Sequence, residues 1–178
     1  PISYAADYDV IDNKVIETFR QNKIKQITEE YMAEKDSEEK IRKEENKDNK
    51  KYKAPAEALI INSAAYYSDN GAVSIAIKSS DNQENKRDMI NVSSTVNTYL
   101  LSEETGIPIL PEQVFTPDYR SKCSEYFTEY FSQKYSNEEL SENWKDYVSN
   151  SYTNFNKFIV EERTVTFFFD EGTVVDKS

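Results

Sequence analysis

The strongest constraint on the fold is a β-hairpin pattern centred on Asn70-Gly71. Apolar and polar residues alternate on both sides of the turn Ser68-Asp69-Asn70-Gly71; the apolar positions are Leu59, Ile61 and Tyr67 before it and Val73, Ile75 and Ile77 after it. An Asn-Gly pair between two alternating runs is the strongest short-range hairpin signal, because both residues tolerate a positive φ. Residues 56–78 are therefore predicted to form two antiparallel strands.

Helical and strand patterns occupy separate parts of the chain. A first helix is predicted after Asp12 or Asn13, either of which can cap it, because apolar residues then recur every three or four positions up to Tyr31. Four more elements follow the hairpin: a strand over 89–101, helices beginning at Pro117 and Ser136, and a closing hairpin over 155–174. This order predicts an α+β fold, with an antiparallel sheet of about five strands and helices packed on one face.

The length fits one domain over residues 1–178, since 178 residues can enclose a substantial core. A division into two subdomains, about 1–80 and 81–178, is the alternative, with a helix and hairpin in the first and a sheet, helix and hairpin in the second. Residues 36–53 are almost wholly Glu, Lys, Asp and Asn. A charge run of this kind is typical of an exposed connector, either a helical extension or a loop.

Composition excludes several classes of function. The net charge of −11 disfavours nucleic acid and anionic membrane surfaces, whose binding needs Lys and Arg, but it permits a basic protein partner. The chain has no histidine and one cysteine, which excludes the usual Ser-His-Asp, Cys-His and zinc sites. With three glycines it also lacks a Gly-rich phosphate loop. We expect no catalytic residues, cofactor or metal in this segment.

Two stretches of the chain carry a resemblance to a known family. One is Thr105-Gly106-Ile107-Pro108-Ile109-Leu110-Pro111-Glu112-Gln113-Val114-Phe115, and the other is the closing hairpin up to Asp170-Glu171-Gly172-Thr173-Val174. They resemble an extracytoplasmic accessory domain of bacterial peptidoglycan and polysaccharide deacetylases, which also forms the sensor of a lysozyme-responsive anti-sigma factor. Both motifs are packing motifs, and the family's catalysis belongs to a separate domain, so the resemblance implies no catalytic residue here.

The resemblance implies two functions. The first is a non-catalytic, extracytoplasmic module of a cell-wall-associated protein, attached to a polysaccharide deacetylase and contacting the wall glycan. The alternative is a sensor or inhibitor-binding domain that recognises a basic protein such as lysozyme. In both cases the location is the cell surface or the exterior, and we expect the parent protein to be membrane-anchored outside this segment.

Aromatic residues are the candidate contacts for either ligand. Exposed rings stack on sugar faces and anchor protein interfaces, and the candidates are Tyr66, Tyr67, Trp144, Tyr147 and Tyr152. The alternative is that these rings fill the core and its rim, because the chain is poor in aliphatic residues. Cys123 lies on an apolar helix face, where a buried small hydrophobe is expected rather than a reactive thiol.

Overall fold

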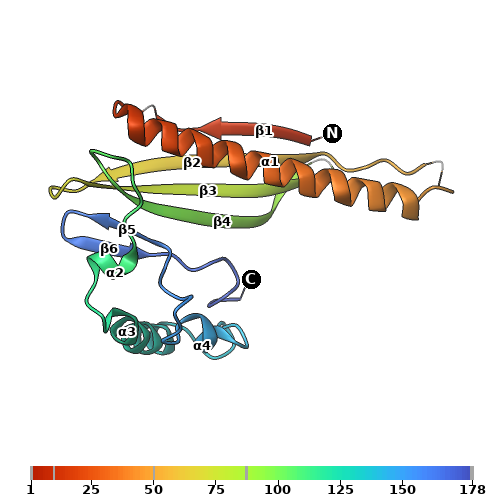
Figure 1. The fold of residues 1–178 in the computed structure, drawn as a ribbon. Coiled ribbons are helices and arrows are strands. Elements are labelled where there is room, and N and C mark those ends of the chain that lie inside the picture. The colour runs from red at the N-terminus through yellow and green to blue at the C-terminus, as the bar shows by residue number, and fades with distance from the viewer. Residues whose placement is uncertain (1, 10, 50, 87, 177–178) are drawn as a thin grey trace. The chain divides into compact units, whose positions relative to one another are not determined.

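The computed structural model describes residues 2–9, 11–49, 51–86 and 88–176 (Figure 1). Its elements in chain order are β1 (Ile2–Asp7), α1 (Lys14–Glu45), β2 (Glu57–Tyr67), β3 (Ala72–Asn85), β4 (Asp88–Ser102), α2 (Pro111–Val114), α3 (Tyr119–Lys134), α4 (Trp144–Tyr147), β5 (Phe158–Glu161) and β6 (Thr164–Phe167). The α+β class is confirmed.

The strands form two sheets rather than the predicted single one. The larger has the order β1-β2-β3-β4, and the smaller pairs β5 with β6. The prediction of a wholly antiparallel sheet is wrong, because β1 runs parallel to β2 from Ile2↔Glu57 to Asp7↔Asn62. A parallel neighbour is feasible because α1 connects the two strands and returns the chain to the same end. Most of β1 is exposed, so no alternating apolar pattern marks it in the sequence.

Side-chain hydroxyls hold β5 against the larger sheet in place of a backbone ladder. The Phe158 N–H donates to Thr98 Oγ1 at 2.9 Å. The Val160 N–H donates to Ser74 Oγ at 2.8 Å, and Ser74 Oγ donates back to the Val160 carbonyl at 3.2 Å. Ser74 is fully buried, so these bonds satisfy groups that water does not reach. Because side-chain hydroxyls take the place of backbone partners along β5, the closing hairpin forms its own sheet.

The chain divides into two compact units, and neither is a continuous stretch. Unit 1 comprises residues 1–63 and 77–94, and unit 2 comprises residues 64–76 and 95–178. The chain therefore passes from one unit to the other three times, each time inside a strand: in β2, β3 and β4.

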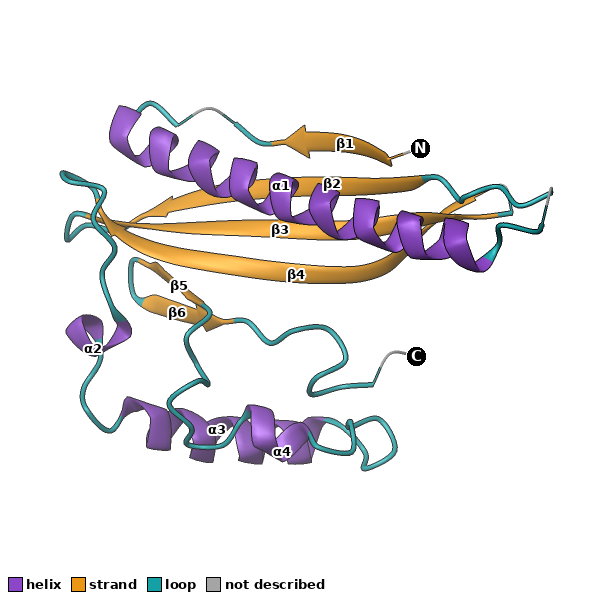
Figure 2. Ribbon diagram, turned by 45° about the vertical axis from the view of Figure 1, so that its right-hand side comes forward, coloured by secondary structure: helices purple, strands orange, loops and turns teal. Residues whose placement is uncertain are grey.

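In unit 1, α1 lies along the strands (Figure 2). The side chain of Asn13 caps the helix by accepting from the N–H groups of Val15 and Ile16, as predicted. The predicted apolar stripe is buried at Ile16, Ile24 and Tyr31. The helix continues into the charged segment 36–53 as far as Glu45, where most side chains are exposed.

The turn between β2 and β3 lies where the Asn-Gly signal places it. The Gly71 N–H donates to the Ser68 carbonyl at 3.2 Å, and the Ser68 N–H donates to the Ala72 carbonyl at 3.0 Å. Gly71 has a φ of +77°, whereas Asn70 keeps a negative φ. The turn is therefore of the kind that ends in one left-handed residue, rather than the predicted kind with two.

The core of unit 2 is aromatic. One cluster of its buried residues comprises Tyr119, Phe131, Leu140, Trp144, Val148, Phe155 and Val174. Phe127 packs among them, with ring centroids 5.1 Å from Phe169 and 5.8 Å from Phe155. Phe115, which directly follows α2, packs 4.8 Å from Tyr119 of α3 and 4.9 Å from Phe158 of β5, so it joins these two elements.

The helix predicted from Ser136 is reduced to the four residues of α4. Leu140 forms a β-bridge with Val175, and the N–H of Ser141 donates to the Val174 carbonyl at 3.0 Å. Residues 137–139 form a turn, and residues 139–141 then pair with the C-terminal segment. This long-range pairing overrides the helical pattern of the local sequence.

Candidate functional site

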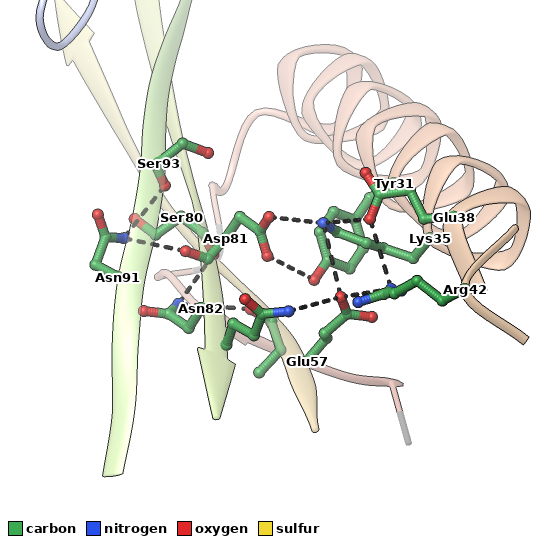
Figure 3. Close-up of polar contacts among 12 residues, drawn as sticks. Tyr31, Lys35, Glu38, Arg42, Glu57, Ser80, Asp81, Asn82, Asn91 and Ser93 are labelled. Atoms are coloured by element: carbon green, nitrogen blue, oxygen red, sulfur yellow. Dashed lines mark hydrogen bonds and ion pairs between the residues drawn. The ribbon is translucent and has the colours of Figure 1, made fainter. Parts of the chain in front are cut away.

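A cluster of charged side chains in unit 1 is the first candidate site (Figure 3). One face of α1 carries Tyr31, Lys35, Glu38 and Arg42, spaced so that all four project towards the strands. Lys35 Nζ lies 2.9 Å from Asp81 Oδ2 on β3 and 3.9 Å from Glu57 Oε1 on β2. Arg42 Nη2 lies 2.9 Å from the same Glu57 oxygen. Tyr31 donates to Asp81 Oδ1 at 2.9 Å.

The charges of this cluster are engaged with one another. Glu57 is 4% exposed and accepts from Arg42, while Glu38 lies 3.2 Å from Lys35 and 3.6 Å from Arg42. A buried carboxylate is tolerated only when such partners replace its water. The cluster therefore fixes α1 to the strands, and its functional groups face inward rather than towards a ligand.

The pKa shifts agree with a closed network. Burial and then the hydrogen bond to Asp81 raise the pKa of Tyr31 far above its ordinary value. Burial lowers the pKa of Lys35, but hydrogen bonds to Asp81 and Glu38 outweigh it and leave the pKa raised. Both groups keep their protons at neutral pH, so neither can serve as a general base there.

The second candidate is a pocket in unit 2, which we call the Tyr66 pocket. It has a volume of about 340 Å³ and is lined by Tyr66, Tyr67, Glu161, Glu162 and Thr164. Tyr66 and Tyr67 end β2, while Glu161 and Thr164 are paired residues at the tip of the β5-β6 hairpin. The bonds from Ser74 to Val160 hold that hairpin in place, immediately before Glu161.

The turn that supplies the carboxylates is strained. Glu162 has a φ of +41°, in the left-handed region that residues with a β-carbon rarely adopt. A two-residue hairpin turn needs a positive φ at its first central position, which glycine usually provides. Retaining Glu there costs on the order of 1 kcal/mol or more, and such strain concentrates at functional positions. Arg163, the other turn residue, lies outside the pocket lining.

The five predicted contact residues lie in four different environments. Tyr66 and Tyr67 line the Tyr66 pocket; Tyr66 is half-buried and Tyr67 is 46% exposed. Trp144 is 8% exposed and belongs to the aromatic core, so it takes no part in a surface site. Tyr147 lines a smaller cavity of about 200 Å³, here called the Tyr147 cavity. Tyr152, at 78%, is the most exposed of the five and lies outside both linings.

Sequence reasoning missed Glu161, Glu162 and Thr164 as pocket residues. The sequence places them only within the closing hairpin, and their proximity to Tyr66 depends on a contact between distant segments. The sequence analysis also did not identify Tyr126 and Tyr130 as an exposed aromatic pair. Both are exposed on α3, and their rings stack with centroids 6.1 Å apart. Their spacing of four residues was a usable signal, since such pairs face the same side of a helix.

The remaining chemistry of the described residues is limited. Cys123 is half-buried against the aromatic core, and burial raises the pKa of its thiol. Among the residues that the structure describes, no three Cys, Asp or Glu side chains are grouped so as to hold a metal ion. Within the same residues, no helix has the length and apolar character needed to cross a membrane.

Comparison with known proteins shows a likeness of fold. No protein-family model matches the chain, and no curated protein matches it. Among solved structures, a member of the DUF3298 family from Bacteroides fragilis aligns with a TM-score of 0.55 and 15% sequence identity. The alignment covers 86% of this chain and 60% of the other, so the chain spans less than two thirds of that protein. That family is a domain of unknown function, and the likeness extends to the fold alone.

Proposed function

We propose that this chain is a non-catalytic, extracytoplasmic binding module that recognises a basic protein. The Tyr66 pocket is the observation that carries the proposal. It places two tyrosine side chains and two carboxylate-bearing residues around one hollow of about 340 Å³. Carboxylates attract a Lys or Arg side chain, and a tyrosine ring face stabilises the same cation through its π-system.

The charge of the whole chain supports a basic partner. A net charge of −11 raises the rate of encounter with a cationic protein and disfavours an anionic one. Charge alone discriminates little between basic proteins, so specific contacts must come from the tyrosines of the pocket. Lysozyme is the natural first probe, because the family that the sequence resembles includes a lysozyme-responsive sensor.

The same resemblance supports a setting for the module. We place it in a cell-wall-associated protein, either beside a polysaccharide deacetylase domain or in a membrane-anchored sensor. The full-length gene distinguishes the two settings. A metal-binding deacetylase domain encoded there would favour the first, and a membrane span with a cytoplasmic helical segment would favour the second.

Calorimetric titration tests the binding proposal. Lysozyme is titrated into the chain at low ionic strength, with cytochrome c as a basic control protein of similar size. We expect tighter binding of lysozyme, weakening as salt is raised from about 0.01 to 0.1 M, which shortens the Debye length from about 30 to 10 Å. Equal affinity for both proteins, or no binding of either, would contradict the proposal.

Two variants assign the binding to the pocket. Tyr67→Ala should raise the dissociation constant about tenfold, as expected for a residue at an interface hot spot. Glu162→Gln should weaken binding more than Glu142→Gln, an exposed control that changes the net charge by the same amount. Equal effects of the two Glu variants would reduce the role of the pocket to general electrostatic attraction.

The non-catalytic part of the proposal has a separate assay. The isolated chain, incubated with divalent metals and acetylated chitooligosaccharides, is expected to release no acetate. Metal-dependent acetate release that is lost on mutation of an Asp or Glu of this chain would overturn it.

A further inference from the structure

The Tyr147 cavity differs in chemistry from the Tyr66 pocket and lies within the same unit. Its walls come from residues 153–157, 167–170 and 173, together with Tyr147, which is 45% exposed. The volume of about 200 Å³ is below the range of pockets for drug-sized ligands, which suits a ligand of one ring.

Hydrogen bonds from a lining residue, Asn154, to the neighbouring segment hold the wall of this cavity in place. The Asn154 side-chain amide donates to the carbonyls of Asp146 at 2.8 Å and Ser149 at 2.9 Å, and to Ser149 Oγ at 3.1 Å. These three bonds use the nitrogen alone. The Asn154 side-chain oxygen accepts no hydrogen bond from the described residues, which leaves an acceptor for a ligand.

The backbone at the next residue is also held in an unusual conformation. Phe155 has a φ of +59°, which is rare for a bulky side chain. Its ring is buried and stacks 5.8 Å from Phe127. The aromatic core thus anchors this segment of the wall in a conformation that the local sequence does not favour.

The charges at the cavity neutralise each other. Lys157 Nζ lies 2.6 Å and 2.7 Å from the two carboxylate oxygens of Asp170. Every other side chain of the lining is uncharged. A charged ligand would have to compete with this ion pair, whereas a hydroxyl group can donate to a remaining lone pair of Asp170 without breaking it.

We propose that the Tyr147 cavity binds one sugar residue of a neutral glycan. The apolar face of a pyranose ring would stack on Tyr147, and its hydroxyl groups would donate to the side-chain oxygens of Asn154 and Asp170. The Lys157–Asp170 pair would select against charged sugars. This site is independent of the Tyr66 pocket, so the chain would contact a glycan and a basic protein through different residues.

Nuclear magnetic resonance titration of the full chain tests the proposal. The probes are chitotetraose and cellotetraose, which are neutral, and the glucosamine tetramer, which is cationic at neutral pH. We expect at least one neutral tetramer to bind and to shift the side-chain amide signals of Asn154 and Asn156. We expect the glucosamine tetramer to bind at least about tenfold more weakly.

Two tyrosine variants locate the binding. Tyr147→Ala should weaken binding of the neutral tetramer about tenfold. Tyr152→Ala is the matched control, because this more exposed tyrosine lies nearby in sequence but outside the lining. Both variants are first shown to retain wild-type Trp144 fluorescence. Absence of binding by both neutral tetramers, preference for the cationic one, or equal effects of the two variants would overturn the proposal.

Discussion

Glu57→Gln tests whether the charged cluster fixes α1 to the strands. This change keeps the size of the side chain and one oxygen acceptor, and removes only the negative charge. Glu57 is 4% exposed, with Arg42 at 2.9 Å and Lys35 at 3.9 Å. At an effective dielectric constant of about 20, these pairs are worth about 5.7 and 4.3 kcal/mol of attraction.

The net loss is smaller than these attractions. Removing the charge also removes the several kcal/mol that its desolvation costs in the folded state. Arg42 and Lys35 both retain Glu38 as a partner, at 3.6 Å and 3.2 Å, and Lys35 also retains Asp81 at 2.9 Å. Loss of one member of a buried pair typically costs 3–5 kcal/mol of folding stability. Because both cations keep other carboxylate partners, we expect Glu57→Gln to cost about 3 kcal/mol, at the lower end of this range.

Glu38→Gln is the control, since it makes the same chemical change opposite the same two cations. Glu38 is 43% exposed, so its loss should cost less than about 1 kcal/mol. Urea unfolding followed by far-ultraviolet circular dichroism measures both values, because α1 supplies most of the helical signal. Equal destabilisation by the two variants, or a loss below about 1 kcal/mol for Glu57→Gln, would refute the argument from burial.

Three further predictions concern pH, the hairpin turn and the thiol. The pKa values of Tyr31 and Lys35 are raised in the folded state, so this state binds more protons than the unfolded one above about pH 10. Their stabilisation is complete below that pH, and urea midpoints measured from pH 8 upward should fall beyond it. Gly71→Ala should cost about 1 kcal/mol in urea unfolding through backbone strain alone, because nothing lies within 4 Å of an added Cβ; an unchanged midpoint would contradict the positive φ. Cys123 should react slowly with a thiol reagent in the native chain and rapidly in denaturant, since burial raises its pKa; equal rates would show an accessible thiol.

Much of the fold was predictable where local patterns agreed with tertiary contacts. The cap at Asn13 and the turn at Gly71 were found because each depends on residues within one turn. The parallel strand β1 and the shortened α4 were not, because they depend on pairing with residues more than 30 positions away. A helical pattern is only a weak preference, which such contacts override.

The candidate sites divide in the same way. Tyrosines were identifiable as candidates from their residue type, but exposure is set by the fold, and it separates Trp144 from Tyr147 within one short helix. The carboxylates of the Tyr66 pocket were not identifiable, because they reach Tyr66 through the attachment of β5 by Ser74.

The passage of the chain between the two units inside β2, β3 and β4 has a consequence for dividing the protein. A single break at the exposed Asp69–Asn70 bond would leave each fragment with part of both units. Neither fragment could complete a core alone, but each would carry strand edges that only the other can pair. The two fragments should therefore be insoluble when made separately and should reassemble when made together. The chain could then serve as a split protein, in which recovery of the folded state reports that the two fragments have come into contact.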